Sequence, residues 1–238
     1  MKLMLFSDQS SVPPEKVGNR LAELVNKEQP IVGYISSCPD KSRQFYQQAE
    51  KYYSQFQAVL SPYLDLEDGF STSVMELVFQ ADAIHLSGGN TFRFMYWILQ
   101  RGLKEQLIRY VDTGGILIGV SAGSIIMTPN ISISKLCDDK NEIGLENLAG
   151  LNLVNFHYLP HAVSHRVVAK DIILKSKQEA RAIVLASDRD WIVINETKCE
   201  IHGVPKLIVK GKISDIENLC LFMKNNPLSF NFGDRPSR

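Results

Sequence analysis

A serine set between glycines is the first feature of this sequence that could carry out chemistry. Residues 119–123 read Gly-Val-Ser-Ala-Gly and match the pattern Gly-x-Ser-x-Gly. An apolar run at residues 116–118 precedes them, and residues 125–127 follow before Pro129. A buried strand, a tight turn and a short helix form the context in which this motif presents a nucleophilic serine. Ser121 is therefore a candidate nucleophile, and a glycine-rich turn without chemistry is the alternative.

A nucleophilic serine needs a general base, and three of the five histidines lie close together in the sequence. His157, His161 and His165 follow one another at intervals of four residues. A metal-binding helix face is one interpretation, but Pro160 interrupts the helix and no neighbouring carboxylate or cysteine completes a ligand set. We predict that His161, on the rigid turn that follows the strand-like residues 153–156 and Pro160, is the base. His85 lies inside an apolar strand and is predicted to be a hydrogen-bonded core residue.

The base in turn needs an orienting carboxylate. Asp138, Asp139 and Glu142 lie between Ser121 and His161 in the sequence. Each could orient an imidazole, and each could equally be a solvated loop residue.

The turn at residues 87–91, Ser-Gly-Gly-Asn-Thr, follows another short apolar strand. It lacks the spacing of phosphate-binding glycine loops. Its backbone N–H groups could instead supply a second oxyanion donor beside the N–H of Ala122.

These motifs together resemble those of the dipeptidase E and cyanophycinase family of serine peptidases. The similar segments are residues 86–92, residues 119–123 and the pair Pro160-His161, in that order and spacing. The resemblance covers most of the chain, from the first strand to about Ile194. It implies a fold like that of the class I glutamine amidotransferases, with serine in place of the cysteine nucleophile.

Carried over position by position, the resemblance implies a nucleophile, a base and two backbone oxyanion donors at Ser121, His161, Gly89 and Ala122. The acid of this family lies in the loop between the nucleophile and the base. Counting back from Pro160-His161 places it at Asp139, with Asp138 the next choice.

Asn90 and Arg166 are further candidates, for contact with the substrate. Dipeptidase E proteins have a longer charged loop after the histidine that helps to recognise an N-terminal aspartate. Residues 162–166 form only a short segment here, so a preference for aspartate is not carried over.

Alternating strands and helices must position these residues. Strands are predicted at residues 3–6, 31–35, 59–66, 83–86 and 116–118, and helices lie between them, the one at residues 92–111 broken near Gly102. This order predicts an α/β fold whose mostly parallel sheet is flanked by helices on both faces. Late antiparallel strands, attached to the same sheet, are predicted at residues 182–185, 191–195, 199–203 and 206–209, after a helix at residues 166–177.

The helix predicted at residues 42–56 has an aromatic side. That side is formed by Phe45, Ala49, Tyr52, Tyr53 and Phe56. We predict that it faces the core, and a ligand-binding surface is the alternative.

Composition narrows the class of protein. The 238 residues, 45% of them hydrophobic, suit a single α/β domain over residues 1–238, with a weakly ordered tail at residues 225–238. Lys plus Arg and Asp plus Glu both number 26, which argues against a nucleic-acid partner. No signal peptide and no membrane span are predicted, and the four isolated cysteines indicate reduced thiols in the cytoplasm.

The sequence thus predicts a cytoplasmic serine-type peptidase that hydrolyses small peptides without a metal or cofactor. A homodimer is compatible with it. An esterase of the α/β-hydrolase type is one rival, although its histidine normally comes much later than 40 positions after the serine. A non-catalytic binding module on the same scaffold is the other.

Overall fold

The structure, a computed structural model, describes residues 1–162, 169–179, 181–196, 198–217, 219 and 222–223. The predictions made for His165, Arg166 and the tail at residues 225–238 fall outside these residues. Among the described residues, no helix is long and apolar enough to cross a membrane.

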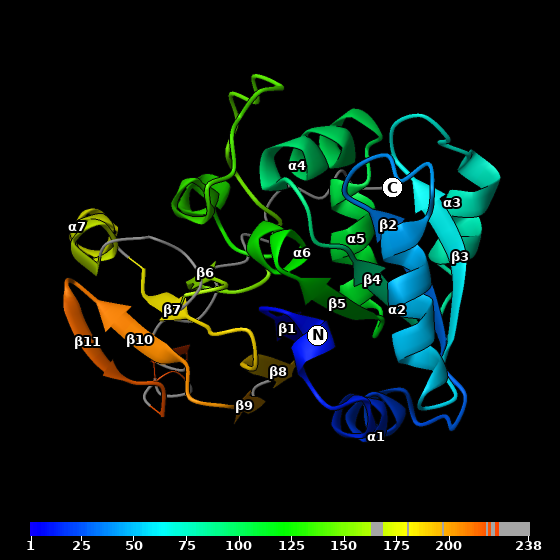
Figure 1. The fold of residues 1–238 in the computed structure, drawn as a ribbon, viewed down its shortest axis with the longest axis horizontal. Coiled ribbons are helices and arrows are strands. Elements are labelled where there is room, and N and C mark those ends of the chain that lie inside the picture. The colour runs from blue at the N-terminus through cyan, green and yellow to red at the C-terminus, as the bar shows by residue number, and fades with distance from the viewer. Residues whose placement is uncertain (163–168, 180, 197, 218, 220–221, 224–238) are drawn as a thin grey trace, which may run out of the picture.

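Within the described part of the chain, seven strands form the main sheet, in the order β3-β2-β4-β5-β1-β8-β9 (Figure 1). Neighbours from β3 to β1 are parallel, whereas β8 runs antiparallel to β1 and to β9. In sheet order the strands are β3 (Val59–Asp65), β2 (Ile31–Ser36), β4 (Ala83–Leu86), β5 (Ile116–Val120), β1 (Lys2–Phe6), β8 (Trp191–Asn195) and β9 (Lys198–His202). The mostly parallel sheet predicted from the alternating pattern is confirmed.

Helices cover both faces of this sheet. The described helices are α1 (Pro14–Val25), α2 (Gln44–Ser54), α3 (Thr72–Val78), α4 (Thr91–Gln100), α5 (Lys104–Asp112), α6 (Ala122–Ile126) and α7 (Ala169–Gln178), with 3₁₀ helices η1 (Gln9–Ser11) and η2 (Ile131–Cys137). Side chains alternate between the faces of a strand. In β1, Met4 therefore packs with α1 and α2, and Leu5 packs with α3 to α6.

A second sheet lies beside the main one, at the end away from β3 (Figure 1). Its order is β11-β10-β7-β6, formed by β11 (Lys212–Asp215), β10 (Lys206–Val209), β7 (Ile183–Leu185) and β6 (His157–Leu159). The prediction that the late strands all join one sheet is therefore wrong for β7 and β10. Only β8 and β9 extend the main sheet, because strand pairing is decided by long-range packing that the local pattern does not contain.

Two elements near the site have other bounds than the sequence pattern predicts. Gly102, with φ +64°, separates α4 from α5 where one interrupted helix was predicted. The expected strand-like segment before His161 is shifted, since residues 153–156 are not a strand and β6 begins at His157. The shift leaves Pro160 and His161 directly after the last residue of a buried strand.

Candidate active site

Ser121 lies on a strained turn between β5 and α6. Its φ of 50° and ψ of −109° are rare for a residue with a side chain. Its N–H donates to Phe6 O at 3.0 Å, which fixes the turn to β1. A Cβ at Gly119 would lie 2.6 Å from Gly123 O, and one at Gly123 would lie 2.0 Å from Leu86 O. The turn therefore needs both glycines to pack against its neighbours.

His161 follows β6 through Pro160 and faces Ser121. Its Nε2 lies 2.9 Å from Ser121 Oγ, within hydrogen-bonding distance. Its backbone N–H donates to the hydroxyl of Ser7, at 2.7 Å, immediately after β1. The backbone of His161 is in the left-handed region, with a φ of +56°. The main sheet and the second sheet thus both hold the imidazole beside the serine.

The carboxylate beside His161 is Asp188, not Asp139. Asp188 Oδ1 lies 2.5 Å from His161 Nδ1. Asp139 lies at the other side of the site, where its Oδ2 accepts a hydrogen bond from Thr91 N at 2.9 Å at the start of α4. The expectation that Asp139 lies beside His161 is therefore wrong, because a position counted along a loop does not determine where its side chain points.

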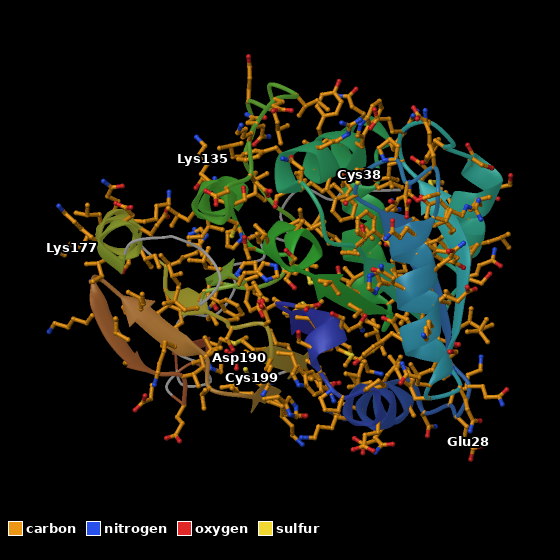
Figure 2. The ribbon with its side chains drawn as sticks, viewed as in Figure 1. Glu28, Cys38, Lys135, Lys177, Asp190 and Cys199 are labelled. Carbon is orange, nitrogen blue, oxygen red and sulfur yellow. The ribbon has the colours of Figure 1, made fainter. Side chains whose placement is uncertain are left out.

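A short turn between β7 and β8 carries Asp188. Asp190, labelled in Figure 2, holds this turn from within the protein and is 2% exposed. Its Oδ2 accepts from Ser187 N at 2.7 Å and its Oδ1 accepts from Val204 N at 2.8 Å. The motifs in the sequence did not indicate this turn, although its acidic residues directly after the short strand at residues 182–185 are a signal that could have identified it.

The glycine turn after β4 lies next to Ser121. Gly88 O accepts hydrogen bonds from Ser37 Oγ at 2.5 Å and from Ser87 Oγ at 3.1 Å. Because a trans peptide is planar, the Gly89 N–H points away from this carbonyl. A Cβ at Gly88 would lie 3.6 Å from Ser121 Cβ, so the turn and the serine are in close proximity. On the other side, Ala122 is the first residue of α6, where N–H groups have no partner within the helix.

Of the other predicted residues, Asn90 and Asp138 have roles in the local fold. The Asn90 amide accepts from Arg93 N and donates to Lys140 O, both at 2.9 Å, so it caps α4 and holds the loop before Asn141. Asp138 ends η2 with φ 59°, and Glu142 is exposed. Arg166 lies outside the described residues.

A cavity of about 460 Å³ opens beside Ser121. Phe45, Ala49 and Tyr52 of α2 line it, together with Cys38, which Figure 2 labels beyond the end of β2. The aromatic side of α2 faces the core as predicted at Tyr52 and Tyr53, which are buried, and at Ala49 and Phe56, which pack against that core. Phe45 is 62% exposed, and together with Ala49 and Tyr52 it also lines the cavity, as the alternative of a ligand-binding surface predicts.

The remaining described histidines have other environments. His85 Nδ1 lies 3.0 Å from Tyr53 Oη, and burial lowers the pKa of His85 to about 3. The prediction of a hydrogen-bonded core histidine is confirmed. His157 Nε2 lies 3.2 Å from Glu179, and His202 stacks on Trp191. In the described part of the chain, no group of three or more His, Cys, Asp or Glu residues could hold a metal ion.

An α/β sheet that presents a histidine-bonded serine on a strand-to-helix turn is the arrangement of a serine-type hydrolase. The chain belongs to peptidase family S51, whose family model matches residues 3–202. The resemblance to dipeptidase E proteins is thereby confirmed, and the enzyme class is that of a serine peptidase.

Individual relatives agree with this family. An uncharacterized peptidase of Pasteurella multocida is 31% identical over 138 residues, which are 57% of this chain and 67% of the relative. Peptidase E of a Nostoc species is 36% identical over 86 residues, 36% of this chain and 34% of the relative. The crystal structure of a Listeria monocytogenes protein, provisionally assigned as a peptidase E, has a TM-score of 0.67 and 25% identity and covers 84% of this chain and 96% of that one.

Proposed function

We propose that the protein hydrolyses small peptides through a triad of Ser121, His161 and Asp188. The observation that carries this proposal is the continuous chain from Ser121 Oγ to His161 Nε2, at 2.9 Å, and from His161 Nδ1 to Asp188 Oδ1, at 2.5 Å. Both ring nitrogens of the base are thereby assigned, one to a nucleophile and the other to a carboxylate.

The chemistry follows from this order of contacts. Ser121 Oγ attacks the scissile carbonyl while His161 Nε2 takes its proton. Asp188 accepts a hydrogen bond from Nδ1, which selects the reactive tautomer and stabilises the imidazolium. His161 then donates its proton to the leaving amine, leaving an acyl-enzyme. A water molecule, activated by the same imidazole, attacks the ester and releases the acid and Ser121.

The oxyanion of the tetrahedral intermediate would be held by the N–H groups of Gly89 and Ala122. The hydrogen bond from Ser37 Oγ to Gly88 O supports this role, because it fixes the direction of the Gly89 N–H. One such donor is typically worth about 3 kcal/mol of barrier.

We also place this activity in a reducing compartment such as the cytoplasm. The support is that Cys38 and Cys137 are free thiols.

Covalent labelling tests the nucleophile. A fluorophosphonate probe should label the wild-type protein and fail to label Ser121→Ala, whose hydrolysis of a dipeptide mixture should fall by roughly 10⁴-fold or more. Ser124→Ala is the matched control, since its hydroxyl lies one turn later and bonds only to Phe6 O and Gly119 O in the described structure. Labelling or turnover retained in Ser121→Ala would refute the assignment.

Ser37→Ala tests the oxyanion hole, whose donors are backbone groups. Turnover should fall by about tenfold with KM little changed, less than the 10²–10³-fold that follows loss of a whole donor. Ser42→Ala, on an exposed residue that caps the loop before α2, is the control. If Ser37→Ala turns over peptides at the wild-type rate, the hydrogen bond from Ser37 does not position Gly89 as an oxyanion donor.

A further inference from the structure

The cavity beside Ser121 has a wall that does not belong to the triad. Phe45, Ala49 and Tyr52 project from successive turns of α2 into it. Val120 and Tyr34 add apolar surface from β5 and β2. At about 460 Å³ the cavity is within the range of small-molecule sites and far exceeds what water alone needs. It can therefore take the largest amino-acid side chains.

The floor of the cavity is electrically neutral. The Gln9 amide donates to Tyr53 Oη at 3.1 Å, so the single phenolic proton of Tyr53 is left for His85 Nδ1, at 3.0 Å. The imidazole of His85 stacks on Tyr34 with the ring centroids 4.9 Å apart. This network holds the imidazole in place as an uncharged aromatic surface beneath the cavity.

The described lining residues of the cavity carry a negative formal charge. Among the described lining residues, Asp8 is the only charged side chain, and no Lys or Arg lines the cavity. Asp8 accepts hydrogen bonds from Ser10 N and from the hydroxyls of Ser10 and Ser11. An acidic substrate side chain would lose its hydration here and meet a like charge.

The position of the cavity assigns it to one side of the scissile bond. Ser121 and Gly89 line it, and His161 is not among its lining residues. The leaving amine must lie next to His161, which protonates it. The acyl part of the substrate must then extend from the serine and the oxyanion site in the other direction, into the cavity.

We propose that this cavity binds the side chain on the acyl side of the scissile bond and selects large uncharged side chains, above all aromatic ones. The inference rests on the proposed triad and oxyanion site. It makes Phe45, Ala49 and Tyr52 specificity-determining residues, and it makes Asp8 the group that rejects acidic substrates.

A dipeptide series with a constant leaving residue tests this proposal. We compare kcat/KM for Phe-Leu, Asn-Leu and Asp-Leu. Phe-Leu should exceed Asp-Leu by about tenfold or more, in the range that apolar pockets achieve. Asn-Leu should also exceed Asp-Leu, which separates the effect of charge from that of size. Asp-Leu as the best substrate would overturn the proposal.

Variants locate the selectivity in the cavity. Phe45→Ala should lower kcat/KM for Phe-Leu about tenfold and leave Ala-Leu nearly unchanged; the Phe45 side chain is 62% exposed, so its loss does not disturb the core. Ala49→Trp should fill the cavity and act in the same direction, and Asp8→Asn should narrow the gap between Asn-Leu and Asp-Leu. Equal effects on all substrates would overturn the assignment.

Two controls separate this inference from the proposed function. Fluorophosphonate labelling of Ser121 does not require a side chain in the cavity, so normal labelling with no substrate selectivity would refute the cavity alone. Loss of labelling would refute the triad. Leu77→Ala, at an exposed apolar residue of α3 that is not among the lining residues, should leave the ratio of Phe-Leu to Asp-Leu unchanged, and a changed ratio there would overturn the assignment of selectivity to the cavity.

Discussion

Two histidine–carboxylate pairs differ in what surrounds them. Their histidines, His157 and His161, lie only four residues apart in the chain. His161 pairs with Asp188 at 2.5 Å, and its side chain is 25% exposed. His157 pairs with Glu179 at 3.2 Å, and its side chain is 1% exposed. The second nitrogen of His161 faces Ser121, whereas that of His157 faces the backbone oxygen of Asn130 at 3.3 Å. One pair is open to a nucleophile and the other is enclosed.

A contact between a histidine and a carboxylate therefore does not by itself predict a catalytic base. His157 points into the space between β6, η2 and α7, where its neighbours accept hydrogen bonds and offer no nucleophile. His161 lies beyond Pro160, at the end of the same strand, where the turn carries the ring out to Ser121. The pair at His157 is expected to stabilise the fold, and the pair at His161 to catalyse.

Replacing each histidine should give the largest contrast. His161→Ala should lower kcat/KM by roughly 10⁴- to 10⁶-fold with little change in unfolding free energy, because the lost base is a partly exposed group. His157→Ala should keep near-normal activity and lose about 1–3 kcal/mol of stability, because it removes a buried imidazole together with its contacts to Glu179 and to Asn130 O. Peptide hydrolysis assays and urea unfolding of both variants measure these changes in activity and stability. Similar losses of activity in both variants would contradict the predicted difference between the two histidines.

The carboxylates should show the same contrast at smaller scale. Asp188→Asn should lower turnover by on the order of 10⁴-fold, because an amide favours the wrong tautomer of His161. Glu179→Gln should leave turnover intact.

Asp139→Asn is the control for the acid predicted from the sequence. It should keep turnover within about tenfold of the wild type and cost about 1 kcal/mol at the start of α4, where it accepts from Thr91 N. A loss in Asp139→Asn as large as that in Asp188→Asn would show that the hydrogen bond to His161 Nδ1 does not identify the acid.

A third contrast lies in stability against pH. Burial lowers the pKa of His157 below 6.5, against the opposing effect of Glu179, so the folded protein resists protonation at this position. As pH falls below the unfolded value of about 6.5, the unfolded chain binds the proton first and the unfolding free energy falls, by at most about 1.4 kcal/mol per pH unit per group.

Urea unfolding between pH 7.5 and 5.5 measures this slope. His157→Gln should have the shallower slope, and a residual slope of the same sign should remain from His85, whose pKa is about 3. A steeper slope in His157→Gln would mean that His157 is protonated by its contact with Glu179 in the folded state, and the enclosed pair would then be an ion pair.

Local patterns were sufficient to predict the fold class and the proximity of Ser121 and His161. The β-branched run before Ser121 and the glycines on both sides of it require a strand and a tight turn, so the strained serine could be placed from the sequence. Pro160 has a fixed φ and cannot continue a helix, which favoured His161 over its neighbours as the base. In each case the physical cause lies within a few residues of the side chain.

The carboxylate that contacts His161, the pairing of the late strands and the cavity depend on tertiary structure. Asp188 reaches His161 because β7 pairs with β6 in the second sheet and because Asp190 holds the turn between the sheets. Asp139 is nearer in sequence, but its loop folds over the start of α4. Phe45, Ala49 and Tyr52 of α2 line the cavity together with residues of β2, β5 and the glycine turn after β4. These contacts join segments distant in the chain, and hydrophobic periodicity reports only which face of each element is buried.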